Sequence, residues 1–417
     1  MKTTCTLSRL GFLVALAWGL APAAHGAVFV QCPGDSNQDA VIDNPALHPN
    51  AKCMHLSGGD GFVTMADGYL QYIFGFSDLT GVLPEQAMSE GMLAANFPAP
   101  TIALKQGQQF YLSLTNAGMA IRPDLFDPHT VHFHGFPQAA PVFDGMPEGS
   151  IGINMGATIT YYYNLIEPGT FMYHCHMEAT EHMQMGMLGS LYVDPIQNRT
   201  GIGGSLAAPD LSTVAAKEGG AGPYGYVYND GDGSTAFDVE IPIQLGSFDP
   251  AFHDASYTVQ PLPFAEMKDK YPMMNGRGYP DTVNSASLPP PIDPETGESA
   301  NGGKVSQPVS SRVTATAGQK ILLRLSNLSV TNFYTVTALG LPMKVVGTGA
   351  HILRGPDGTD TYYDTSSVTL GGGEAADVIV DTGGAAPGTY FLYTTNLNYL
   401  SNNTEDYGGM MTEIVIN

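Results

Sequence analysis

Positive charge is scarce in this 417-residue chain. Lysine and arginine number 16 against 39 aspartates and glutamates, which gives a formal net charge of −23 at pH 7. A surface of this sign repels phosphate backbones and anionic lipid headgroups, so the composition argues against nucleic-acid and membrane-surface partners. Charged residues of either sign make up only 13% of the chain, which leaves little for the polar faces of solvent-exposed helices.

Long apolar runs are missing beyond the N-terminus. Lys2 and Arg9 precede an apolar run from Leu10 to Leu20, and small residues continue to Gly26. This order is typical of a secretory signal peptide cut after Gly26, and the alternative of an N-terminal membrane anchor is less favoured. The run is too short to cross a bilayer, and no later segment is long enough. We predict a signal peptide over residues 1–26 and a secreted protein, periplasmic or extracellular, without a membrane span.

Amphipathic helical patterns are scarce as well. The chain holds 50 glycines and 30 prolines, and short runs rich in Val, Ile, Tyr, Phe and Thr recur between clusters of turn residues. This pattern of short β-prone runs between turns predicts an all-β fold of sandwich type. About 390 residues remain after the predicted signal peptide, enough for two or three domains.

Cysteine is limited to four residues. Cys5 lies in the predicted signal peptide, and Cys32 and Cys53 lie near the mature N-terminus. In an exported chain the latter two are expected to form a disulfide, within an N-terminal extension over residues 27–59. Cys175 is then unpaired, and a lone thiol in an oxidising compartment needs a group that holds its sulfur.

The mature chain contains an internal repeat. Three segments of the first half align with three of the second: 97–116 with 313–327, 130–135 with 335–340, and 168–176 with 387–395. We therefore predict two copies of one β-sandwich over residues 60–197 and 238–417, joined by a glycine-rich linker over 198–237.

The repeat also provides an internal control. In the second copy Tyr334, Thr337 and Leu339 replace His129, His132 and His134, and Tyr393, Thr394 and Thr395 replace His174, Cys175 and His176. The sandwich pattern survives there without these groups. The fold therefore does not require them, and the first copy has them for another reason.

Strand geometry sorts these side chains into two groups. Because side chains alternate along a strand, His132 and His134 share one face, His174 and His176 share one, and Cys175 points oppositely. His129 lies an odd number of residues from His132 and so faces towards Cys175.

The loop after Cys175 adds His182 and Met187. Two imidazoles, a thiolate and a weak thioether form the type 1 copper site used for one-electron transfer. Zinc accepts cysteine and histidine but has no role for the methionine. The alternative of scattered histidines around a buried cysteine does not account for their absence from the second copy.

The motifs HTVHFHG (129–135) and YHCHMEATEHMQMGM (173–187) resemble the cupredoxin domains of multicopper oxidases and of two-domain copper nitrite reductases. The resemblance implies two consecutive cupredoxin-like Greek-key β-sandwiches, the second degenerate and free of copper. It implies type 1 copper at His129, Cys175, His182 and Met187, and a second copper site at His132, His134, His174 and His176. It also implies a homotrimer that shares second-site ligands between subunits.

The sequence departs from both families. The trinuclear cluster of the oxidases takes four His-X-His pairs, and this chain has two. The reductases have aspartate at the position of His132 and a further histidine in domain 2, which the segment 394–400 does not offer. His253 and His351 are lone histidines, expected to be exposed, although either could complete the second site.

Three readings follow. The favoured one is a copper oxidoreductase that takes electrons from a small reducing substrate and carries a reduced second site. The second is an electron shuttle with type 1 copper alone. The third is a copper-handling protein, because thioethers favour Cu(I) and Met172, Met177, Met183, Met185 and Met187 crowd the site. Apart from Met187, we expect these methionines to pack the core.

Overall fold

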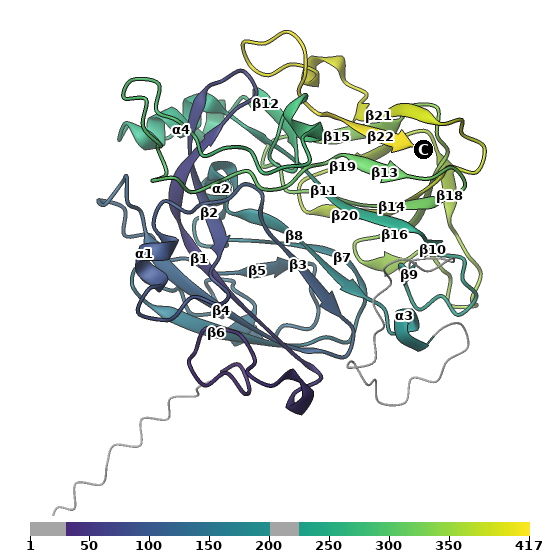
Figure 1. Cartoon of the computed structure of the whole chain (residues 1–417), viewed down its shortest axis with the longest axis horizontal. Helices are drawn as coiled ribbons and strands as arrows, with labels where there is room; N and C mark the ends of the chain where they lie inside the picture. Colours follow the sequence, from purple (N-terminus) through teal and green to yellow (C-terminus); the bar gives the residue numbers. More distant parts are fainter. Residues whose placement is uncertain (1–30, 201–224) are drawn as a thin grey trace, which may run out of the picture.

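The computed structural model describes residues 31–200 and 225–417 (Figure 1). The predicted signal peptide over 1–26 and part of the predicted linker, 201–224, lie outside the described residues. Strands dominate the described part, so the predicted all-β class is confirmed. None of the helices within these two ranges has the length and hydropathy needed to span a bilayer.

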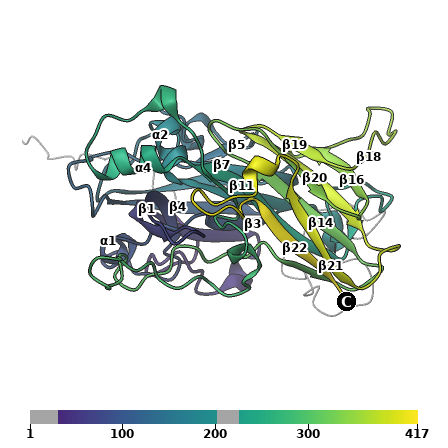
Figure 2. The ribbon, with the colours of Figure 1, turned by 90° about the horizontal axis from the view of Figure 1, so that it is seen from above.

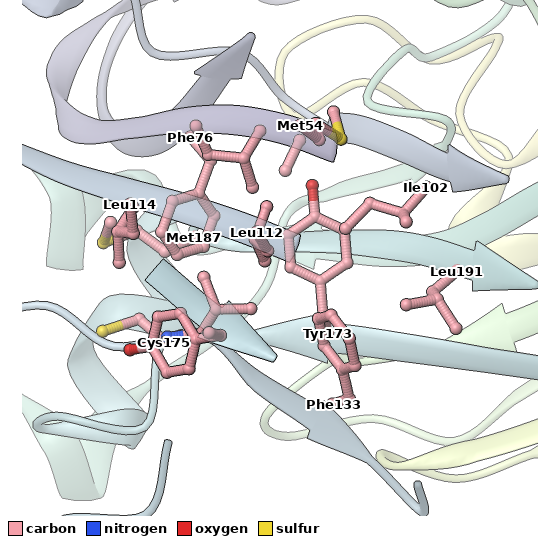
Figure 3. Close-up of a cluster of buried hydrophobic side chains, with 14 of the residues drawn as sticks. Met54, Phe76, Ile102, Leu112, Leu114, Phe133, Tyr173, Cys175, Met187 and Leu191 are labelled. Atoms are coloured by element: carbon pink, nitrogen blue, oxygen red, sulfur yellow. Dashed lines mark hydrogen bonds between the residues drawn. The ribbon is translucent and has the colours of Figure 1, made fainter. Parts of the chain in front are cut away.

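Domain 1 is a sandwich of two four-stranded sheets. The first has the order β2-β1-β4-β6, formed by β1 (Ala51–Thr64), β2 (Leu70–Asp78), β4 (Gln109–Gly118) and β6 (Thr158–Asn164). The second has the order β3-β8-β7-β5, formed by β3 (Ala99–Lys105), β5 (His132–His134), β7 (Gly169–His174) and β8 (Leu188–Asp194). The inward side chains of both sheets form a dense apolar core that includes Cys175 and Met187 (Figure 3).

Domain 2 repeats this architecture. Its larger sheet has the order β12-β11-β14-β20-β16-β17, with β18 also pairing β16. Its strands are β11 (Val239–Phe248), β12 (Tyr271–Met274), β14 (Lys320–Asn327), β16 (Met343–Thr348), β17 (His351–Ile352), β18 (Tyr363–Thr365) and β20 (Glu374–Asp381). The other sheet has the order β13-β22-β21-β15-β19, formed by β13 (Val313–Ala315), β15 (Tyr334–Ala338), β19 (Val368–Leu370), β21 (Gly388–Thr394) and β22 (Met411–Ile416).

Strand register agrees with the alignment of the two sequence repeats. His132 pairs with His174 between β5 and β7, and the aligned Thr337 pairs with Tyr393 between β15 and β21. In domain 1, β1 pairs in parallel with β4, and in domain 2, β11 pairs in parallel with β14. β4 and β14 are the aligned strands of the first repeated segment. The two sandwiches are therefore copies of one topology, and only the first carries the histidine and cysteine side chains.

Two predicted boundaries differ from the structure. β1 begins at Ala51, inside the segment predicted as an extension, because residues 51–64 supply the strand that joins β2 to β4. The disulfide between Cys32 and Cys53 ties the N-terminal segment to this strand.

The described ends of the predicted linker are also structured. They form α3 (Gln197–Thr200) and a ribbon of β9 (Gly225–Tyr226) and β10 (Ala236–Phe237). Three apolar side chains of this part are buried against domain 2, namely Val227, Tyr228 and Phe237. The glycine-rich composition of the segment hid this packing from the sequence analysis.

Short helices cover the ends of the sandwiches. These are α1 (Ala87–Gly91), α2 (Ala179–Met185), α4 (Pro250–Tyr257) and the 3-10 turns Pro45–Leu47, Pro141–Phe143, Phe264–Glu266, Asp281–Val283 and Leu397–Tyr399. Asp249 caps α4 by accepting a hydrogen bond from the backbone N–H of Ala251. α2 and α4 both contact β2. They lie near one another (Figure 2), so domain 2 reaches the loop that follows Cys175.

Candidate metal centres

The first centre lies where three segments of domain 1 meet. Cys175 follows the last residue of β7, and its backbone N–H donates to the carbonyl of Met187 at 3.0 Å. This bond closes the intervening loop, in which α2 carries His182. His129 precedes β5 and is held by an antiparallel bridge to Ile153. Backbone pairing therefore brings all of these predicted residues to one place.

Both imidazoles face the sulfur through the same ring atom. Nδ1 of His182 lies 3.1 Å from Sγ of Cys175, and Nδ1 of His129 lies 4.0 Å from it. The three donor atoms lie within 4.8 Å of one another, and the three side chains are fully buried. Two ring nitrogens and one sulfur thus converge on a space closed to solvent.

The surroundings favour the thiolate form of Cys175. Burial by itself opposes ionisation, but the neighbouring His182 and His129 outweigh it and hold the pKa of Cys175 well below its usual range. Burial also opposes the charge of His182, yet Cys175 and Asp127 raise the pKa of His182 to about 10. The thiolate is the form of cysteine that binds metals.

Met187 reaches the same space from the other end of the loop. A Cβ added to Gly58 of β1 would lie 2.8 Å from Cδ2 of His129 and 3.2 Å from Cε of Met187. The imidazole and the thioether therefore lie against the same stretch of backbone, which leaves no room for a side chain. Glycine at position 58 makes this close approach feasible.

The donor set fits copper. Nε2 of both His129 and His182 is buried without a hydrogen-bond partner, and Nδ1 of each ring faces the sulfur of Cys175. Histidines that serve only as packed core residues usually have their polar atoms paired. A thiolate, two imidazoles and a thioether suit a metal that cycles between Cu(I) and Cu(II).

Two carboxylates lie near His182. Oδ2 of Asp127 is 3.8 Å from Nε2 of His182, and Asp127, Glu178 and His182 form a second group of converging donor atoms. Glu178 precedes α2 and has a left-handed backbone conformation, with φ at 47°. Asp127 has no motif around it, so only the folded loop reveals its place.

The second centre is a group of four imidazoles from two paired strands. The ring centroid of His132 lies 5.2 Å from that of His174, 4.9 Å from His176 and 6.0 Å from His134. Donor atoms of His132, His134 and His174 lie within 4.8 Å of one another. The structure thus brings all four predicted rings together, with His176 outside the tightest group of three.

Hydrogen bonds orient two of these rings. Nδ1 of His132 lies 2.6 Å from the carbonyl of Asp144, whose carboxylate is 3.5 Å away, and Nδ1 of His174 lies 2.9 Å from the carbonyl of Cys175. A ring that donates through Nδ1 presents the lone pair of Nε2, as metal-binding histidines do. The role of Asp144 in holding His132 appears only in the fold.

Burial favours the neutral form of three rings in the second group. It lowers the pKa of His132 and His134, and it lowers the pKa of His174 to about 3. Nδ1 of His134 is buried without a partner, while its Nε2 would lie 2.7 Å from a Cβ added to Gly373 of domain 2. Domain 2 therefore covers this centre with glycine backbone.

The lone histidines of domain 2 do not join either centre. His253 is fully buried, so its predicted exposure was wrong; its two ring nitrogens lie 2.5 Å from the carbonyl of Tyr72 and 2.9 Å from that of Gln184. His351 is exposed, as predicted. Within residues 31–200 and 225–417, the groups of converging donors contain neither residue.

Comparison with known proteins agrees with this geometry. Residues 82–198 and 266–415 match two family models, each described as multicopper oxidase, and together these segments cover more than half of the chain. L-ascorbate oxidase of Cucurbita pepo is 36% identical over 109 residues, 25% of this chain and 18% of the relative. Laccase abr2 of Aspergillus fumigatus is 31% identical over 116 residues, 27% of this chain and 18% of the relative. The matched region is thus less than a fifth of each relative.

Solved structures share the fold. Blue copper oxidase from Nitrosomonas europaea has a TM-score of 0.58 at 20% identity, covering 87% of this chain and 85% of its own. Copper nitrite reductase from the same organism has a TM-score of 0.53 at 14% identity, covering 87% and 93%. These likenesses show the fold alone, and the two family models show that the chain belongs to the multicopper oxidase family.

Proposed function

We propose that this protein is a secreted oxidoreductase that takes single electrons from a small reducing substrate. In this proposal His129, Cys175, His182 and Met187 hold a type 1 copper, and His132, His134, His174 and His176 hold a second copper site. One observation carries it. The two donor groups meet at the consecutive residues His174 and Cys175, and the second sandwich keeps the same strand register without either group.

Bound copper would supply the one-electron chemistry, and the chain would tune and connect it. The backbone N–H of Thr130 points at Sγ of Cys175 from 3.5 Å, and such a donor stabilises a thiolate. Full burial of Cys175 and His182 excludes water from the sulfur. Loop closure by the Cys175–Met187 backbone bond keeps the ligand positions fixed when the charge changes.

The link between the two centres is short and covalent. His174 is bonded directly to Cys175 in the chain, and its Nδ1 also lies 2.9 Å from the carbonyl of Cys175. An electron that enters at the sulfur therefore reaches the second group of imidazoles through one residue. This path supports transfer from the first centre to the second.

One observation favours a second candidate, an electron shuttle without a catalytic second site. The described residues supply only domain 1 histidines to that centre, and Gly373 rather than a ligand lies against His134. Copper handling is less favoured, because Met172 and Met185 are buried in apolar clusters as core residues.

Copper content decides between these functions. We expect purified wild-type protein to hold more than one copper per chain, with an intense visible band and an additional paramagnetic signal. Cys175→Ser should lose the band and remain folded, whereas Thr394→Ser, the aligned change in domain 2, should keep it. One copper per chain with no further signal supports the shuttle, and a retained band in Cys175→Ser refutes the ligand assignment.

Two further expectations belong to the same proposal. Fractionation of cells that express the full chain tests export. Sedimentation of the purified protein tests the homotrimer that the family resemblance implies.

A further inference from the structure

Electron entry at the first centre needs a route, because His182 is fully buried and Nε2 of its ring has no solvent-exposed surface. A soluble reductant cannot touch this ring without a rearrangement of the loops around it. The electron must therefore pass through a neighbouring side chain. Aromatic rings in contact are the best candidates, because their delocalised π orbitals couple an electron donor to an acceptor without being oxidised themselves.

A line of aromatic contacts leads from His182 to a cavity. The ring of Phe74 lies edge-on to His182 with centroids 5.7 Å apart, and Tyr72 lies 5.7 Å from Phe74. Tyr72 then contacts Phe62 at 5.5 Å and Tyr257 at 5.5 Å. These last three rings form one wall of an open cavity of about 580 Å³ between β2, α4 and the segment 293–300.

Another part of the cavity lining is acidic. Asp293, Glu295 and Glu298 line it, and no lysine or arginine does. Asp254 also lines it and accepts a hydrogen bond from the hydroxyl of Tyr69 at 2.7 Å. A flat apolar body fits the aromatic wall, and a positive charge fits the carboxylates and the negative faces of the rings.

We propose that this cavity binds a cationic aromatic reductant and that Tyr72 and Phe74 carry its electron to His182. The inference rests on the proposed function, since the electron acceptor is Cu(II) at the first centre. The bound ring would give up one electron, copper held at the first centre would accept it, and a phenolic substrate would release its proton to solvent. Neither the family models nor the relatives assign this cavity a role.

Binding and electron transfer are tested separately. Phenyltrimethylammonium, a redox-inert aromatic cation, is titrated calorimetrically into the wild-type protein with and without copper. We expect saturable binding in both forms, weakened by added salt, and at least about tenfold weaker binding of benzenesulfonate because of the acidic part of the lining. Tyr257→Leu removes a half-exposed ring of the wall and should weaken the cation about threefold to tenfold, as expected for loss of a cation–π contact.

A matched pair of variants isolates the charge. Glu295→Gln with Glu298→Gln removes two exposed carboxylates from the cavity, and Glu85→Gln with Glu148→Gln removes two exposed carboxylates elsewhere. The first pair should weaken phenyltrimethylammonium at least about fivefold and the second less than about twofold, because distant exposed charges are screened. Equal effects of the two pairs, or no saturable binding, would overturn the proposal.

Stopped-flow bleaching of the visible band then tests the route. A trimethylammonio-substituted hydroquinone should reduce the copper faster than hydroquinonesulfonate, and phenyltrimethylammonium should compete with it. Tyr257→Leu and the cavity pair should slow the cationic donor alone. If Asp127→Asn slows it and the cavity variants do not, electrons enter beside His182 and the proposal is wrong. Absence of the band refutes the proposed function and leaves the binding result standing.

Discussion

Arg324 offers a stringent test of how the two domains are held together. It lies in β14, is fully buried, and forms ion pairs with Glu240 at 2.9 Å, Asp194 at 3.4 Å and Asp377 at 3.6 Å. Asp194 ends β8 of domain 1, and Nη1 of Arg324 also donates to the hydroxyl of Thr170 in β7. One guanidinium thus neutralises carboxylates from both sandwiches.

Arg324→Met keeps most of the volume and removes the charge. Asp377 is fully buried and then loses its cation, keeping only hydrogen bonds from Thr170 and Tyr228. Removal of one partner from a buried ion pair costs about 3–5 kcal/mol, because the remaining charge is uncompensated. Since Glu240 and Asp194 are partly exposed, we place the loss of unfolding free energy in this range and not above it.

Urea denaturation at neutral pH measures the loss of unfolding free energy. A double variant and the pH dependence then test whether the uncompensated charge of Asp377 causes it. Asp377→Asn in the Arg324→Met background should recover at least half of the lost stability, because the amide removes the charge while its oxygen accepts from one hydroxyl and its NH2 donates to the other. Burial already raises the pKa of Asp377, and loss of Arg324 raises it further.

The pH dependence has a defined sign. A carboxyl whose folded pKa exceeds its unfolded value favours folding at low pH, and this contribution is lost as the pH rises through the folded pKa. The deficit of Arg324→Met should therefore shrink as the pH falls from about 8 towards 4.5. A deficit below about 1 kcal/mol at neutral pH, or one that grows on acidification, would refute the reasoning.

Three further outcomes follow from the structure. Met187→Leu should keep copper and raise its reduction potential, because the thioether donates weakly to Cu(II); a spectroelectrochemical titration with unchanged potential contradicts the axial role. Burial lowers the pKa of His253 to about 4 from 6.5, so its contribution to stability is present above pH 6.5 and falls by about 3 kcal/mol as the pH drops to 4. Denaturation of His253→Phe should show a smaller acid loss than wild type. Gly58→Ala should displace His129, shift the visible band and cost about 1–3 kcal/mol, whereas Gly384→Ala, whose Cβ meets open space, should do neither.

The periodicity of the sequence and the spacing of its motifs predicted much of the fold and of the candidate site. The repeat predicted two sandwiches, and the register that pairs Thr337 with Tyr393 as His132 pairs with His174 agrees with that alignment. Alternation along a strand placed Cys175 on the face opposite His174. These inferences succeeded because strand pairing and side-chain alternation are local properties that a motif and its spacing encode.

Other features depend on contacts between segments far apart in the chain. Pairing of β1 with β4 moved the start of domain 1 to Ala51, which no local pattern marks. His253 looked like an isolated exposed histidine, but packing of α4 on β2 buries it between two carbonyls from domain 1.

The sequence alone indicated the kind of chemistry that we propose, since the residue types of the candidate ligands and their absence from the second repeat can be read from it directly. Only the tertiary structure decided what surrounds that chemistry. It set Gly58 against His129, Asp127 beside His182, Gly373 over His134, and an aromatic cavity two rings away from the first centre. The physical reason is that exposure, packing and electrostatic neighbours arise from the meeting of remote strands and loops, whereas a ligand motif lies within one strand and its turn.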